Sequence, residues 1–181
     1  MKCKKEFQNL VTITLSVMLV LSALITNVQA VSAAEIHELR LESEMALKKA
    51  SGEEVYEILD DNGDIMGYFL PGYVSDQSRS GSYNVNWTIP ESRYAWGRQS
   101  FSFVKGDEIN VSISQSPSGA GMVSYLGLYD VDTGSAGFPS ATLSTNGWST
   151  GVIVVGHSGH FSLAIKNLSS RTITYTGRYW F

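Results

Sequence analysis

The sequence contains very little cysteine, and its one cysteine lies close to the N-terminus. Cys3 falls in a basic stretch that precedes an apolar run from Leu10 to Ile25, and small residues follow that run. This order is typical of a secretory signal peptide, which we predict over residues 1–34. The apolar run is shorter than the roughly 20 residues of a membrane-spanning helix, so we expect cleavage rather than anchoring. The mature chain would have no cysteine, which excludes disulfides, a thiol nucleophile and cysteine metal sites.

Positive charge is also scarce. The whole chain has 13 Lys and Arg against 17 Asp and Glu, a net charge of −4. Loss of residues 1–34 would leave 10 basic and 16 acidic residues, a net charge of about −6. Nucleic-acid-binding proteins concentrate Lys and Arg, so nucleic acid is not an expected partner. An anionic membrane surface would not attract such a chain. We therefore expect a secreted, extracellular protein without stable membrane insertion of its mature form.

Recognisable catalytic patterns are missing from the chain. No G-x-S-x-G nucleophile elbow lies in a strand-turn-helix context, because no helical pattern follows a strand. Glu91 and Glu108 are acids of the type that cleave glycosides, but neither lies in a recognisable cleft pattern. Without a triad, a metal-ligand set or a phosphate loop, the sequence predicts neither an enzyme nor a cofactor.

The first part of the mature chain, residues 35–74, predicts a short helix and a β-hairpin. Residues 35–50 carry acids in the first turn and two lysines in the last, and Gly52 follows as a stop signal. The expected apolar face is a thin stripe, which suggests a weakly held arm. Its members are Ile36, Leu39, Ala46, Leu47 and Ala50.

The hairpin is expected over residues 53–72, around the turn signal Asn62-Gly63. The acids of Asp60-Asp-Asn-Gly-Asp64 also resemble a calcium loop, but Pro71 stands where such a loop needs a bidentate acid. A plain turn is therefore preferred. The polar segment 75–81 follows and is the expected linker, which makes 35–74 a candidate pro-region.

Residues 82–181 alternate apolar and polar side chains in short runs, separated by Gly, Asn, Asp and Ser turns. This pattern predicts an all-β fold: a single antiparallel β-sandwich, jelly-roll-like, with about eight strands. In the last run, Tyr175, Tyr179 and Phe181 should share one face. Arg178 and Trp180 should lie on the other.

A family resemblance appears in "FSFVKGDEINVSIS", "YLGLYDVDTG" and "GVIVVGHSGHFSLAIKNLSS". Residues 97–181 resemble the jelly-roll accessory domains of secreted bacterial proteins, of the pre-peptidase C-terminal-like or GOLD-like kind. The resemblance implies a non-catalytic accessory or binding role. This chain departs from the family habit, because no catalytic domain stands beside the module.

Two histidines, His157 and His160, stand three apart in a glycine-bracketed segment. A zinc site would need at least one more ligand, and the remaining histidine, His37, lies in the predicted helix. The segment is therefore predicted to be a turn and not a metal site.

The most suggestive chemistry lies in residues 86–99, where aromatic and arginine side chains gather around Pro90. If exposed, they would suit a surface that stacks on sugars or binds protein. The alternative is that the rings cap one end of the core, which is the more common fate of large rings. The candidate binding residues are Trp87, Arg93, Tyr94, Trp96 and Arg98.

Two functions fit these patterns. The first is a secreted, non-catalytic β-sandwich module that binds a glycan, a cell-wall polymer or another exported protein. The second is a small secreted antimicrobial or toxin-like protein whose pro-region, up to residue 80, is removed. A mature N-terminus near Arg79 would favour the second function.

Overall fold

The computed structural model describes residues 33–75, 81–139 and 147–181. The predicted signal peptide and the predicted linker lie largely or wholly outside these ranges. Within the described residues, no helix is both long enough and apolar enough to cross a bilayer.

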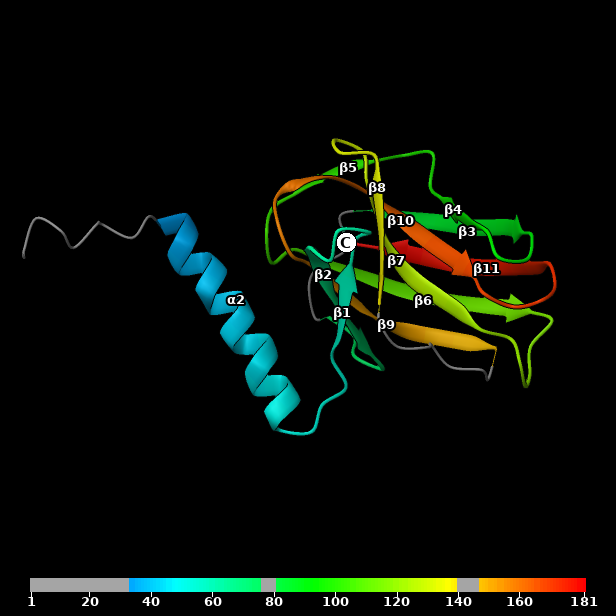
Figure 1. The fold of residues 1–181 in the computed structure, drawn as a ribbon, viewed down its shortest axis with the longest axis horizontal. Helices are drawn as coiled ribbons and strands as arrows, with labels where there is room; N and C mark the ends of the chain where they lie inside the picture. The colour runs from blue at the N-terminus through cyan, green and yellow to red at the C-terminus, as the bar shows by residue number, and fades with distance from the viewer. Residues whose placement is uncertain (1–32, 76–80, 140–146) are drawn as a thin grey trace, which may run out of the picture. The chain divides into compact units, whose positions relative to one another are not determined.

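Over the described residues the fold is almost entirely β, with one helix, α2 (Ala33–Ala50), before the strands. The strands are β1 (Tyr56–Leu59), β2 (Ile65–Pro71), β3 (Ser82–Ile89), β4 (Tyr94–Trp96), β5 (Phe101–Phe103), β6 (Glu108–Ser116), β7 (Ser124–Asp130), β8 (Ser135–Pro139), β9 (Trp148–Val155), β10 (Gly159–Asn167) and β11 (Ile173–Trp180). All of them pair antiparallel in the order β3-β11-β6-β9-β2-β1-β8-β7-β10-β4, and β5 also pairs with β10. The sheet curls until it is nearly closed and barrel-like (Figure 1).

The all-β antiparallel class is confirmed, but the sheet of the described residues has eleven strands. Nine of them lie in residues 82–181, where about eight were predicted, and the other two are the hairpin strands. The short strands β4 and β8 lie in stretches predicted to be loop or turn. The sequence pattern also predicts a short strand over residues 140–144, and these residues lie outside the described ranges.

The hairpin of β1 and β2 forms as predicted, but it does not precede the sandwich as a separate piece. β2 pairs with β9 and β1 pairs with β8, so the hairpin joins the two halves of the sheet. Its side chains Ile58 and Phe69 are fully buried in the same core as β6, β7 and β10. The reason is physical: a two-stranded hairpin with an apolar face is marginal alone and gains stability by pairing.

The tight turn of this hairpin is organised by Asp60. Its carboxylate accepts hydrogen bonds from the amides of Asn62 (2.8 Å) and Asp64 (2.9 Å). These backbone bonds, that of Asp64 first, hold the pKa of Asp60 below its ordinary value. Gly63 has a φ of 88°, which suits glycine. The predicted turn is confirmed.

The C-terminal part of α2, from Leu41 onward, packs on the outer face of β2 and β9. Leu41 and Met45 are buried against Val55, Tyr68, Leu70, Val152 and Val154. The predicted stripe is wrong for Leu39 and Leu47, whose side chains are 60% and 70% exposed. The helix ends as predicted at Ala50, and Gly52 follows it with a φ of 91°.

The main core fills the interior of the curled sheet with side chains from both halves. Alternation places Val111 of β6, Leu128 of β7 and Leu163 of β10 inside. In β11, Tyr175 and Tyr179 point into this core and Phe181 packs against it. On the other face, the Arg178 guanidinium lies over the Trp180 ring at 5.3 Å. The predicted faces of the last strand are confirmed.

Candidate ligand groove

The ends of the strand order, β3 and β4, approach each other without pairing among the described residues. An open groove of about 720 Å³ lies along this seam, and we call it the seam groove. Its principal lining side chains are Tyr83, Trp87, Trp96, Arg98, Gln99 and Tyr179. Its volume falls within the range typical of small-molecule sites.

The groove stays open partly because of Gly97. Its amide donates to the carbonyl of Leu163 (3.0 Å), which fixes the chain just after β4. A Cβ at Gly97 would lie 3.5 Å from the Tyr179 hydroxyl and 3.8 Å from the Trp87 ring. Both of these residues line the groove, so a larger side chain here would grow into it.

Beside the groove, the outer face of β4, β10, β7 and β8 carries four aromatic rings, which we call the aromatic cluster. They are Tyr94, Trp96, Tyr129 and Phe138. Trp96 stacks on Tyr129 with ring centroids 4.4 Å apart and an interplanar angle of 14°. The ring centroid of Tyr94 lies 5.6 Å from that of Trp96 and 5.7 Å from that of Phe138.

Small residues on the intervening strands let these rings meet across the sheet. Trp96 is opposite Ala164 of β10, and Ala164 is opposite Gly127 of β7. A Cβ at Gly127 would lie 2.8 Å from the Phe138 ring, so only glycine accommodates that ring here. The rings therefore lean over a floor of Ala164 and Gly127, where larger side chains would hold them apart.

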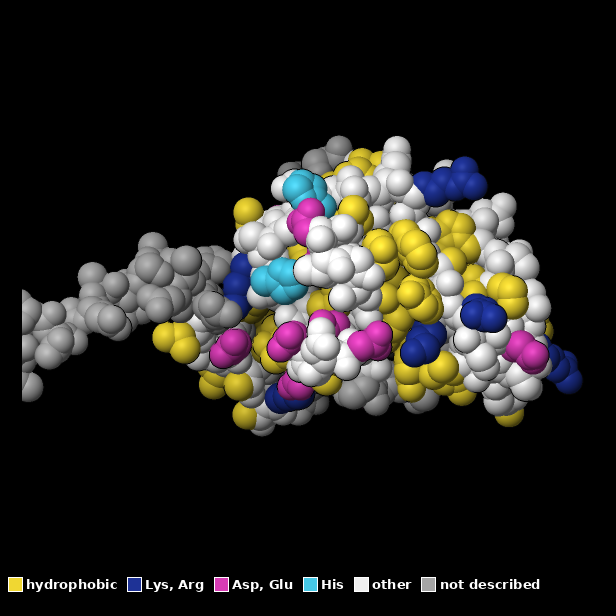
Figure 2. Space-filling view, turned by 45° about the horizontal axis from the view of Figure 1, so that its top comes forward, with side chains coloured by type: hydrophobic (Ala, Val, Ile, Leu, Met, Phe, Trp, Pro, Cys, Tyr) yellow, Lys and Arg dark blue, Asp and Glu magenta, His cyan; other side chains and the backbone are white. Residues whose placement is uncertain are grey.

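The cluster remains accessible despite these contacts. Tyr94 and Trp96 are each 43% exposed, whereas Trp87 is half-buried and packs against the core. Figure 2 shows hydrophobic side chains gathered near the centre of one face, with Lys and Arg side chains beside them. The more common fate of large rings, burial as a core cap, therefore fits Trp87 but not Tyr94 and Trp96.

The connection between β3 and β4 is fixed by Asn167, a residue that sequence analysis did not single out. Its side-chain amide donates to the carbonyls of Ile89 (3.0 Å), Pro90 (3.1 Å) and Arg171 (2.7 Å). Its backbone amide donates to the carbonyl of Arg93 (2.8 Å). Asn167 is fully buried, and so determines where β4 and its two exposed rings begin.

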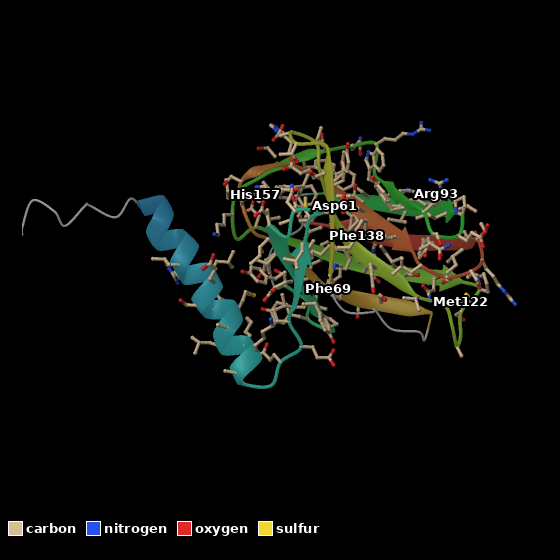
Figure 3. All side chains as sticks on the ribbon, viewed as in Figure 1. Asp61, Phe69, Arg93, Met122, Phe138 and His157 are labelled. Atoms are coloured by element: carbon tan, nitrogen blue, oxygen red, sulfur yellow. The ribbon has the colours of Figure 1, made fainter. Side chains whose placement is uncertain are left out.

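The five predicted binding residues lie in or beside the seam groove and the aromatic cluster. Trp87, Trp96 and Arg98 line the seam groove, and Trp96 also belongs to the aromatic cluster with Tyr94. Arg93 is exposed at the start of β4, while Phe138 lies on β8 (Figure 3). Sequence analysis did not identify Tyr129 and Phe138 as site residues. The only signal that they lie on the outer face of the sheet was their alternation with buried residues.

The histidine segment lies far from this site. His157 projects at the opposite end of the molecule from Arg93 (Figure 3). Residues 156–158 connect β9 to β10, so the predicted turn is confirmed.

The His160 ring lies 3.0 Å from the Asp132 carboxylate, and this hydrogen bond is the largest cause that lowers the Asp132 pKa. The described residues include no group of three His, Cys, Asp or Glu able to hold a metal.

One further segment, Gly147-Trp-Ser-Thr-Gly151, has the letters of a nucleophile elbow. However, β9 runs from Trp148 to Val155, and it leads into β10 rather than into a helix. The strand-turn-helix context that exposes a catalytic serine is not formed there.

No protein-family model matches this chain, and a search of the curated proteins finds no match either.

Proposed function

We propose that this protein is an exported, non-catalytic binding module that holds a glycan or cell-wall polymer at the seam groove and aromatic cluster. The observation that carries the proposal is the position of Trp96. Its half-exposed ring belongs to both surfaces and joins them into one continuous site. Rings presented in this way stack on the apolar faces of sugars, with little loss of conformational entropy.

The groove lining supports this assignment. Beside the aromatic rings it includes uncharged hydrogen-bonding side chains: Ser82, Asn84, Thr88 and Gln99. Such groups can both donate hydrogen bonds to the hydroxyls of a saccharide and accept hydrogen bonds from them. Among the described residues, the lining includes no carboxylate, imidazole or thiol, the groups that hydrolases commonly use. Binding without reaction is the function that these side chains suit.

The strand order supports the finer parts of the proposal. Apart from the hairpin, β3-β11-β6-β9 and β8-β7-β10-β4 form two four-stranded sets. Their members alternate along the chain except at β7 and β8, which are consecutive strands of one set. This arrangement is the one expected of a jelly roll. It fits the resemblance to accessory domains of secreted bacterial proteins, and with it the proposals of export and of a bacterial source.

The alternative of an antimicrobial or toxin-like protein with a removable pro-region is less well supported. Removal of residues up to 80 would take out β1 and β2, which lie between β9 and β8. An integral hairpin favours the binding module.

The test is retention of variants on soluble and insoluble polysaccharides. Each stacked ring contributes about 0.5–1.5 kcal/mol beyond buried area, so Tyr94→Ala with Trp96→Ala should weaken binding about tenfold or more. Tyr73→Ala is the matched control, because Tyr73 is 42% exposed outside the site. Unchanged binding in the double variant, together with a marked fall in Tm, would show that the rings are structural only.

A further inference from the structure

The charges of the described chain are unevenly distributed. Residues 41–75 contain two lysines and eight acids: Glu42, Glu44, Glu53, Glu54, Glu57, Asp60, Asp61 and Asp64. Residues 82–100 and 159–181, which supply β3, β4, β10 and β11, contain one acid and five cations. The acid is Glu91, and the cations are Arg93, Arg98, Lys166, Arg171 and Arg178. Figure 2 shows the same segregation, with acids gathered toward one end of the face and most basic side chains toward the other.

The cations near the site are not used to neutralise acids of the protein. Among the described residues, no ion pair joins Arg93, Arg98 or Lys166 to a carboxylate. On the acidic side, by contrast, Lys48 pairs with Glu53 at 3.5 Å and Lys49 with Glu57 at 2.8 Å.

These cations stand next to the aromatic rings. The Lys166 ammonium lies 5.2 Å from the centroid of the Phe138 ring, and Lys166 is the cross-strand partner of Tyr94. Arg93 immediately precedes Tyr94, and Arg98 follows Trp96 by two residues on the groove wall. Positive charge therefore occurs at both ends of the pair of exposed rings.

We infer that the ligand is an acidic polysaccharide, a polymer of sugar rings that carry carboxylate groups. This inference rests on the proposed function and names its ligand class. The sugar faces stack on Trp96 and Tyr94, while Arg98 and Lys166 bind carboxylates on successive rings. Arginine suits this task, because its planar guanidinium matches a carboxylate with two hydrogen bonds.

Other polyanions fit less well. An open-chain polyol phosphate would satisfy the cations but offers no ring face to the exposed aromatics. An acidic polypeptide would also satisfy the cations, but it would not need the row of hydroxyl and amide side chains in the groove. A polymer of carboxylated sugar rings would use the cations, the exposed aromatic rings and the hydroxyl and amide side chains together.

The experiment compares polygalacturonate, alginate and hyaluronan with their methyl-esterified forms, which keep the sugar ring and lose the charge. Calorimetric titration of the full chain should give at least tenfold tighter binding to one or more of the acids than to its ester. That binding should weaken as salt is raised, because exposed charges are screened. Arg98→Gln and Lys166→Gln should each weaken binding of the acid about threefold. The ratio of acid to ester affinity should therefore fall in both variants. Lys49→Gln on the acidic side is the matched control, and it should leave the binding of both the acid and the ester unchanged.

Three other results would each contradict the inference of an acidic polysaccharide. Equal affinity for acid and ester, lost in Trp96→Ala, would overturn the acidic ligand and leave the proposed function standing. No binding to any polymer would overturn both. If polyglutamate or poly(glycerol phosphate) binds as tightly as the uronates, the carboxylated sugar ring is not what the site recognises.

Discussion

Trp96 shows how the position of one side chain depends on the size of its neighbours. Its ring stacks on Tyr129 across β10, because Ala164 beneath it is small. Trp96 nevertheless remains 43% exposed, so part of its surface is accessible. Asn167 has the complementary role, because its buried amide holds the turn from which β4 starts. In that turn Ser92 has a φ of 55°, an unusual conformation for a residue with a Cβ.

Replacing Asn167 with Ala should destabilise the protein by about 3 kcal/mol. The carbonyls of Ile89, Pro90 and Arg171 would lose their donor, and leaving buried polar groups unpaired is costly. Urea unfolding measures the free energy, and Asn86→Ala on the exposed face of β3 is the control. Equal effects of the two substitutions would contradict the role given to Asn167.

The paired substitution His157→Asn with His160→Asn should leave Tm nearly unchanged, because the His160–Asp132 pair is exposed at the surface. Thermal unfolding and the metal content of the purified protein check this expectation. Stoichiometric zinc in the wild type that disappears in the double variant would contradict the interpretation as a turn.

At the scale of elements, the β1–β2 hairpin is the part whose role differs most from expectation. Hydrogen bonding to β9 on one side and β8 on the other makes it the bridge between the two halves of the sheet. Opposite this bridge in the strand order is the seam between β3 and β4. One seam is thus closed by an added hairpin, and the other is left open as the groove.

A fragment of residues 81–181 should therefore lose cooperative unfolding relative to the chain of residues 35–181. The fragment lacks Ile58, Met66 and Phe69, all nearly or fully buried, and it exposes the edges of β8 and β9. Deletion of even one large core side chain costs about 2–5 kcal/mol. Denaturant unfolding followed by circular dichroism is the measurement. A fragment that unfolds with the same midpoint as the longer chain would show that the hairpin is dispensable.

For the whole molecule, burial of tyrosine limits stability at alkaline pH. Desolvation is the largest cause that raises the pKa values of Tyr68, Tyr175 and Tyr179 above the ordinary 10.0. The Tyr175 hydroxyl lies 2.7 Å from the Ser124 hydroxyl in the core, and this bond lowers its pKa in part. The folded state therefore prefers the protonated form of all three phenols.

The stability that these protonated phenols contribute is therefore fully present below about pH 10. It is lost as the pH rises through the pKa values of the three phenols in the folded protein. Phenolate absorbance should show part of the tyrosines titrating late in the folded protein and normally in denaturant. Tyr175→Phe should reduce the alkaline loss of stability, although it also removes the bond to Ser124. If all tyrosines titrate alike in both states, these three phenols are not protected by the fold.

Several parts of this structure follow from sequence alone. Alternation identifies β3, β6, β10 and β11, because a strand with one face in the core repeats every two residues. Asn62-Gly63 gives the hairpin turn and Gly52 the end of the helix, because these conformations depend on local sterics. Part of the candidate site was also found in the sequence, as the aromatic and arginine residues between residues 86 and 99.

The rest depends on contacts between residues far apart in the chain. The three residues of β4 are too few to show a period, and their strand character comes from pairing with β10. The partners of the hairpin and the meeting of Trp96 with Tyr129 and Phe138 depend on strand order, which no local pattern contains. The alternating pattern of the sequence determined the class of fold, and its composition determined the kinds of side chain available to bind a ligand. The tertiary structure decided which rings are exposed and which cations lie beside them, because exposure depends on the neighbours that folding brings together.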